Sequence, residues 1–293
     1  MTRIFRPLLA CLLLAAGLAH AQERFSPFVP SDQENVDRML KLVNLRDDDV
    51  VVDLGSGDGR IVMTAARLNR KLTGFGVDID EKLVAEANAQ AKSRGIADRV
   101  RFLHQNAYDA DLGKATVIAM WLWPEFQRML RPVILAKARP GTRIITNLWD
   151  MGDWWPPDAE DMEGPRVAMW VVPARVEGNW SWELTVEGRR VSYAAIIEQR
   201  FQRLEGVGRA GKRRELLNDM KLRGEDISFA FGITVDGIGF MRHSFTGKAR
   251  GDVIEGKVSI TLPPNHDKPF ELPWRATRGA TSAYFDPTGV DVK

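Results

Sequence analysis

The stretch that decides the fold is VVDLGSGDGR, residues 51–60, an apolar run that ends in three glycines separated by a serine and an aspartate. Glycines between a strand and a helix let the backbone pass close to a ligand, with the helix N–H groups pointing at it. A dinucleotide turn has its third glycine three positions after the second, whereas these are Gly55, Gly57 and Gly59. No Gly-Lys-Ser/Thr follows, which excludes a P-loop. The turn therefore predicts a ligand site, but not a pyrophosphate site.

The charges beside this turn indicate which ligand it holds. Asp53 and Asp58 flank the glycines and would repel a pyrophosphate, whereas they suit a ligand with a cationic end. S-adenosylmethionine (SAM) is such a ligand, because it carries an ammonium and a sulfonium and no phosphate. The sequence therefore favours SAM as the cofactor.

Further polar residues follow the next predicted strands. Asp78 closes the second strand, where an acid can accept both ribose hydroxyls, while Asp80 is better explained as the cap of the helix that follows. The strand VRFLHQ ends at Asn106 and Ala107, whose side-chain amide and backbone N–H can hold an adenine edge. The fourth strand ends at residues 121–125. We expect these strand ends to meet at one edge of a parallel sheet, where open α/β sheets bind ligands.

The chain divides into two parts with different sequence patterns. Strands and helices alternate in its first half, which predicts an α/β fold with a doubly wound, Rossmann-like parallel sheet. From about residue 167 short alternating runs such as NWSWELTV and DISFAFGITV predict an antiparallel β sandwich or barrel. We therefore predict a signal peptide at 1–21, a ligand-binding domain at 22–166 and a smaller β-rich accessory domain at 167–293.

The first residues have the pattern of a bacterial export signal. Arg3 and Arg6 precede an apolar run, and Ala19-His20-Ala21 is a small-x-small cleavage site. We expect cleavage after Ala21 and a periplasmic or secreted protein; the alternative is an uncleaved anchor in the inner membrane. The chain has 41 Lys and Arg against 39 Asp and Glu, and Arg3 and Arg6 account for the difference. A neutral mature chain lacks the basic footprint of nucleic-acid binding, so no nucleic-acid partner is expected.

Four segments together resemble a known family. In this order and spacing VVDLGSGDGR, GVDID, QNAYDAD and WLWPEFQRMLRPVILAKARPGTRII resemble the class I (seven-strand) SAM-dependent methyltransferases. The strongest resemblance is to the bacterial branch related to seven-strand protein-lysine methyltransferases, over about residues 28–155. FVPS, residues 28–31, is similar to the segment that closes over the cofactor in such enzymes.

The resemblance assigns roles to the residues singled out above. It implies that Gly55, Ser56 and Gly57 wrap the methionine part of SAM and that Asp53 lies near that part. It also implies that Asp78 binds the ribose and that Asn106 lies beside the adenine. Asn106 stands where an aspartate is common. Trp121 and Trp123 stand where smaller or aliphatic residues are usual, so the resemblance extends to the cofactor site but does not define the substrate channel.

The acceptor of the methyl group is not specified by the sequence. Methyl transfer mainly requires alignment and exclusion of water, and a protein side chain or a small molecule would serve as acceptor. Glu125 is the candidate to orient or deprotonate it, and the alternative is a first-turn acid favoured by the helix dipole. His20, His104, His243 and His266 show no metal-ligand spacing, so no metal is expected.

The sequence allows two interpretations of the cofactor supply and two of the basic segment in the accessory domain. SAM is made in the cytoplasm, so an exported enzyme needs a supply, and the alternative is an exported non-catalytic SAM- or nucleoside-binding protein or envelope scaffold. The basic segment RAGKRRE, residues 209–215, is explained by a solvated turn or by contact between the accessory domain and the cell envelope.

Overall fold

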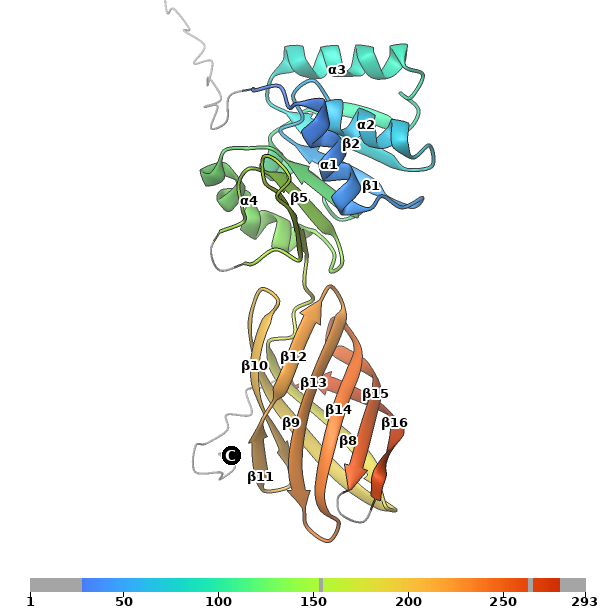
Figure 1. Cartoon of the computed structure of the whole chain (residues 1–293), viewed down its shortest axis with the longest axis vertical. Coiled ribbons are helices and arrows are strands. Elements are labelled where there is room, and N and C mark those ends of the chain that lie inside the picture. Colours follow the sequence, from blue (N-terminus) through green and yellow to red (C-terminus); the bar gives the residue numbers. More distant parts are fainter. Residues whose placement is uncertain (1–27, 153–154, 263–265, 280–293) are drawn as a thin grey trace, which may run out of the picture.

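The computed structural model describes residues 28–152, 155–262 and 266–279, which form two modules joined end to end (Figure 1). The predicted signal peptide lies outside these residues. Within the described ranges, no helix combines the length and the apolar character that crossing a membrane would require.

The N-terminal module is a seven-stranded sheet with helices on both faces. Its helices are α1 (Gln33–Val43), α2 (Arg60–Leu68), α3 (Glu81–Ser93), α4 (Pro124–Lys137) and the short 3-10 helix η1 (Ala107–Asp109). Its strands are β1 (Val50–Leu54), β2 (Thr73–Asp78), β3 (Val100–His104), β4 (Val117–Met120), β5 (Arg143–Asn147), β6 (Ala159–Asp161) and β7 (Val167–Val171). The strand order is β3-β2-β1-β4-β5-β7-β6, and the first five strands are parallel.

Two apolar cores cover the two faces of this sheet. Val51, Ala119 and Ile145 pack with α1, α2 and α3 on one face, while alternate residues of the same strands, such as Val52 and Ile144, pack with α4 on the other. The core residues that these strands contribute are apolar on both faces, as expected for a buried parallel sheet. The predicted doubly wound α/β fold is confirmed.

The predicted border between the modules is wrong at one strand. Val167–Val171, which the sequence pattern assigned to the β-rich domain, pairs antiparallel with β5 and completes the first sheet. All five of its residues are buried, because it lies between β5 and β6. The first sheet therefore ends at Val171 rather than before Val167.

The C-terminal module is one antiparallel sheet of nine strands. Its strands are β8 (Gly178–Val186), β9 (Arg189–Arg200), β10 (Arg203–Ala210), β11 (Arg213–Leu216), β12 (Asn218–Arg223), β13 (Asp226–Val235), β14 (Gly239–Arg250), β15 (Val253–Leu262) and β16 (His266–Arg278). The order is β11-β10-β9-β8-β16-β15-β14-β13-β12, and contacts of β10 with β12 and of β11 with β13 bring the two ends of the sheet together. The rolled sheet encloses an aromatic core that includes Trp182, Phe229 and Phe245. The antiparallel module is thus confirmed.

Two turns of the C-terminal module contact the N-terminal module. Phe201, in the β9–β10 turn, stacks on Trp155 with ring centroids 4.9 Å apart, and the Arg131 guanidinium of α4 lies 5.2 Å from the same ring. In the β12–β13 turn, Gly224 packs against the N-terminal module, where a Cβ added to it would lie 3.1 Å from the Gly141 Cα and 3.6 Å from the Val171 side chain. These contacts lie on the α4 side of the first module.

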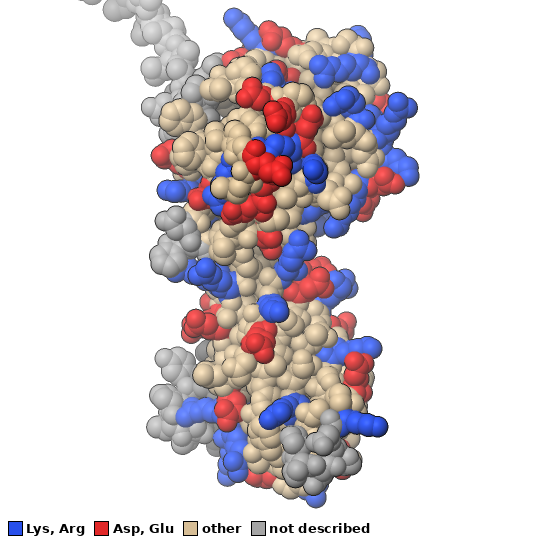
Figure 2. Space-filling model, in the orientation of Figure 1, with Lys and Arg blue, Asp and Glu red and all other residues tan. Residues whose placement is uncertain are grey.

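Charges of both signs are mixed over the visible face of both modules (Figure 2). Residues 209–215 run through the β10–β11 hairpin, where Lys212 and Arg213 line a surface cleft together with Arg189, Arg190 and Asp236. Contact of this surface with an envelope stays a prediction.

Candidate functional site

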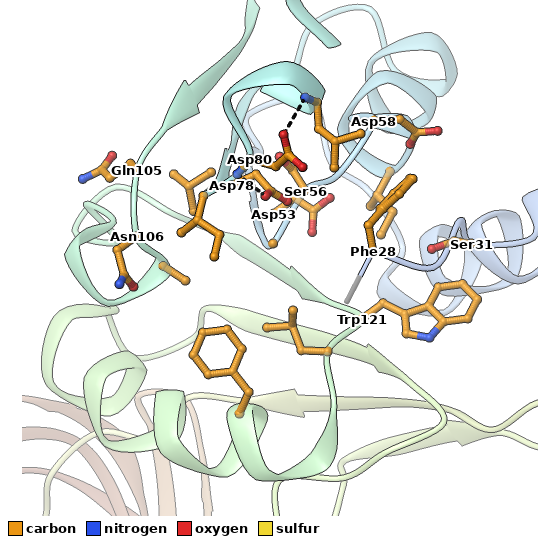
Figure 3. Close-up of a pocket in the computed structure, with 18 of the residues that line it drawn as sticks. Phe28, Ser31, Asp53, Ser56, Asp58, Asp78, Asp80, Gln105, Asn106 and Trp121 are labelled. Carbon is orange, nitrogen blue, oxygen red and sulfur yellow. Dashed lines mark hydrogen bonds between the residues drawn. The ribbon is translucent and has the colours of Figure 1, made fainter. Parts of the chain in front are cut away.

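A pocket lies at the carboxyl ends of β1, β2, β3 and β4 (Figure 3). It encloses about 1170 Å³ including its open mouth. The predicted residues Asp53, Gly55, Ser56, Asp78, Asn106 and Ala107 all line it. The strand ends that the sequence predicted to meet therefore do meet.

The glycine turn needs glycine for its backbone and for its close packing. Gly55, Gly57 and Gly59 have φ of +80°, +51° and +78°, in the left-handed region that side chains disfavour. The Gly55 and Ser56 N–H groups both donate to the Val77 carbonyl at 2.9 Å, which ties the turn to β2. A Cβ added at Gly57 would lie 2.3 Å from the Phe28 ring, so glycine allows the N-terminal segment to pack directly on the turn.

Asp78 organises this turn as well as facing the pocket. One of its carboxylate oxygens accepts from the Gly57 N–H at 2.8 Å, and the other accepts from the Asp80 N–H at 2.9 Å. Each oxygen keeps a further lone pair for a ligand hydroxyl. Asp80 caps α3 by accepting from the Lys82 and Leu83 N–H groups, as predicted, and it lines the pocket too.

Asp53 is a buried acid without a partner. It is 1% exposed, and neither carboxylate oxygen has a hydrogen-bond partner among the described residues. Burial first, and then the charges of Asp78 and Asp58, raise the pKa of Asp53 to about 8. An unpaired buried carboxylate is costly, and a cation would offset that cost. The site therefore fits a ligand with a cationic end, such as the ammonium or sulfonium of SAM, and not a phosphate.

The far wall of the pocket is formed by η1 and the residues before it. The Asn106 Oδ1 accepts from the Tyr108 N–H at 3.0 Å and so caps η1, while Ala107 is buried. For the Asn106 NH2 group the described residues supply no partner, which leaves a donor for an adenine ring nitrogen. Ile79 and Leu83 add apolar lining.

Arg60 is a pocket residue that the sequence did not point out. Its guanidinium donates to Asp58, with Nε 2.9 Å from Oδ1, and to the Ser31 carbonyl. Burial alone would raise the pKa of Asp58, but the hydrogen bonds from Arg60 outweigh it and lower that pKa. Arg60 thus forms an ion pair with Asp58 and holds the segment around Ser31 at the pocket. The contact with Ser31 is formed only in the folded chain, so no local sequence pattern predicts it.

The candidate catalytic residue lies apart from this pocket. Glu125 is exposed in the first turn of α4 and is not among the residues that line the pocket. That position fits the alternative interpretation, an acid that interacts with the helix dipole. A catalytic role for Glu125 stays a prediction. Phe126 and Trp121, close to it in sequence, do line the pocket.

Comparisons with known proteins match this same region. The family model of the ANTKMT methyltransferase domain matches residues 53–158. A protein-lysine N-methyltransferase of Saccharolobus islandicus is 34% identical over 137 residues, 47% of this chain and 85% of that enzyme. The mouse adenine nucleotide translocase lysine N-methyltransferase is 27% identical over 50% of this chain and 63% of its own length.

A solved structure also matches. The crystal structure of an RNA methyltransferase from Salinibacter ruber in complex with S-adenosylhomocysteine is 42% identical, with a TM-score of 0.48, over 50% of this chain and 96% of that one.

The matched residues include the glycine turn and the strand ends around the pocket. A relative that is 34% identical and covered over 85% of its length shows the family. These findings favour a methyltransferase over the non-catalytic binding protein that the sequence left open. The chain belongs to the class I SAM-dependent methyltransferases, in the family that includes the protein-lysine N-methyltransferase of Saccharolobus islandicus.

Proposed function

We propose that this protein methylates a lysine side chain of a protein acceptor. The proposal is supported by the names of the relatives, which include lysine methyltransferases from an archaeon and from a mouse. The region matched by the family model, residues 53–158, lies within the N-terminal module, so the C-terminal module is the part that would adapt this chain to its own acceptor.

The observation that carries the proposal is the partnerless Asp53 carboxylate beside a glycine turn. Bound SAM would supply a methyl group activated by its sulfonium. Around it, Asp53 would offset positive charge and Asp78 would accept from the ribose hydroxyls. The N–H groups of Gly55, Ser56 and Gly57 already donate within the chain and fix the turn. Phe28 packs over the turn.

A lysine amine must lose its proton to become a nucleophile, and it then needs alignment more than a strong base. The pocket residues hold their positions through the sheet and the turn, so they supply alignment. The proton can leave to solvent at the open mouth of the pocket, which makes a dedicated base such as Glu125 optional.

The test is a transfer assay with the full chain. Purified protein is incubated with methyl-tritiated SAM and with peptides that carry one lysine, and matched peptides carry arginine in its place. The expected result is label on the lysine peptides alone, located by mass spectrometry. Label on arginine, on added RNA or on no acceptor would contradict the proposal.

We further propose that residues 1–21 direct export to the periplasm. The support is the charged, apolar and small-residue order of the N-terminus. A reporter fused after Lys293 and scored on both sides of the inner membrane tests it. Reporter activity restricted to the cytoplasm would overturn it.

A further inference from the structure

The carboxyl end of β5 holds a buried polar side chain that has no hydrogen-bond partner among the described residues. Asn147 is 0% exposed, and neither its amide nitrogen nor its amide oxygen is hydrogen-bonded within the described residues. Buried amides in folded proteins are almost always paired. An Asn that stays unpaired inside the chain is suited to a partner that arrives from outside it.

Asn147 lies one strand beyond the wall of the cofactor pocket. β4 and β5 are parallel, with Met120 opposite Thr146, so the next residues, Trp121 just after β4 and Asn147 at the end of β5, lie side by side. Trp121 lines the pocket, and Figure 3 shows its ring on the side where Ser31 lies. Asn147 thus adjoins Trp121, a residue that lines the pocket.

The two side chains also share a face of the sheet with Asp53. Val51, Ala119 and Ile145 all belong to the core beneath α1 and α2. Side chains alternate along a strand, so residues two positions further on return to the same face. Those residues are Asp53, Trp121 and Asn147, on the adjacent strands β1, β4 and β5. Asp53 is opposite Ala119, and Ala119 is opposite Ile145. Trp121 and Asn147 follow these partners by two residues, so they lie further toward the carboxyl edge of the sheet than Asp53.

The chain after Asn147 makes a strained turn. Leu148 has φ of +65°, which is uncommon for leucine. Three hydrogen bonds hold it: the Leu148 N–H donates to the Arg166 carbonyl at 2.7 Å, the Trp149 N–H to the Asn147 carbonyl at 2.8 Å, and the Thr146 hydroxyl to the Trp149 carbonyl at 2.6 Å. The turn leaves Leu148 43% and Trp149 45% exposed. Such strain persists where the surroundings enforce it, and it is common at binding sites.

We propose that Trp121 and Asn147 form the subsite for the acceptor side chain, an inference that rests on the proposed function. The alkyl part of a lysine packs against the Trp121 ring. Its amine donates a hydrogen bond to the Asn147 amide oxygen, which leaves the nitrogen lone pair free to face the cofactor pocket. Leu148 and Trp149 contact the acceptor chain on either side of that lysine.

The experiment uses a bisubstrate ligand, which measures the subsite without turnover. In this SAM analogue nitrogen replaces the sulfonium, and a two-carbon linker replaces the methyl group and joins the ε-amine of an N-acetyl-lysine amide. Calorimetry on the full chain compares its affinity with that of S-adenosylhomocysteine, and the ratio is the gain from the lysine arm. The variants are Asn147→Leu and Trp149→Ala, with Phe240→Ala as the matched control, since Phe240 is 40% exposed on the C-terminal module.

The expected result is a gain in the native protein that falls by about tenfold in Asn147→Leu, the size of one lost hydrogen bond to a charged or polar group. S-adenosylhomocysteine affinity is expected to stay constant. The melting temperature is expected to hold or rise, because leucine replaces an amide that makes no hydrogen bond. Trp149→Ala should lose part of the gain and Phe240→Ala none.

Two results would overturn the inference. One is a gain that survives in Asn147→Leu; the other is a loss of melting temperature and of S-adenosylhomocysteine affinity together, which would make Asn147 structural. A native protein that binds S-adenosylhomocysteine but gains nothing from the lysine arm refutes this subsite alone. A native protein that binds neither ligand refutes the proposed function as well.

Discussion

At the scale of single residues, the buried Asp53 predicts a pH-dependent site. Its pKa is raised to about 8, first by burial and then by Asp78 and Asp58, so a cationic ligand must displace a proton from it at neutral pH. Affinity for S-adenosylhomocysteine, whose ammonium keeps its charge, should rise from about pH 6 to about pH 8, by at most about tenfold per unit. Calorimetry across this range measures the slope. Asp53→Asn should flatten it, and an unchanged slope in that variant would contradict the assignment.

The same residue makes a prediction about stability without ligand. The folded pKa, about 8, lies above the ordinary value of 3.8, so between them the folded state binds more protons than the unfolded one. Stability contributed by protonated Asp53 is therefore lost as pH rises through this window. Asp53→Asn is expected to raise the melting temperature at about pH 8 and to change it little at about pH 4. Equal effects at both pH values would show that Asp53 keeps its ordinary pKa.

The sequence predicted most of the pocket residues but not the acceptor subsite. Glycine spacing and strand-end acids are local signals, and they led to Asp53, Gly55 and Asp78. Asn147 carries no such signal, because its significance comes from lacking a partner in the folded core. Arg60 was missed for the same reason, since its contact with Ser31 joins segments far apart in the sequence.

At the scale of elements, one buried ion pair joins α1 to the sheet. The Arg143 guanidinium at the start of β5 pairs with Asp49 and donates to the Val43 and Asn44 carbonyls at 2.7 and 2.9 Å, at the end of α1. Asp49→Ala leaves that charge buried and unpaired, and should lower the free energy of unfolding by about 3–5 kcal/mol. Chemical denaturation measures it. Glu183→Ala, which breaks the exposed pair with Arg190, is the control and should cost less than about 1 kcal/mol; equal costs would contradict the account.

Element type was easier to predict than element partnership. The sequence predicted short strands from about residue 167, and Val167–Val171 is a strand. Which sheet it joins is decided by the open edge of β5, which an apolar run cannot indicate, so the module border was misplaced by one strand.

At the scale of the whole molecule, Phe201 is one of the residues through which the two modules contact each other. It stacks on Trp155 and lies against Arg131, and its neighbour Gln202 donates to the Pro156 carbonyl at 2.7 Å. Phe201→Ala should loosen the junction while each module stays folded. We expect a larger radius of gyration in X-ray scattering and unchanged S-adenosylhomocysteine affinity. If Phe201→Ala scatters like the native protein and like the control Phe240→Ala, the Phe201 ring does not hold the modules together.

We expect the turn at residues 51–60 and Asp78 to hold SAM, and calorimetry with S-adenosylhomocysteine measures this binding. The account predicts micromolar affinity for the native chain, lost by about a hundredfold or more in Asp78→Ala, since that change removes the ribose acceptor and the bonds to the Gly57 and Asp80 N–H groups. Asp252→Ala, which removes a distant exposed acid of the C-terminal module, should bind like the native chain. Absence of any binding heat in the native protein, or equal affinity in Asp78→Ala, would contradict the claim.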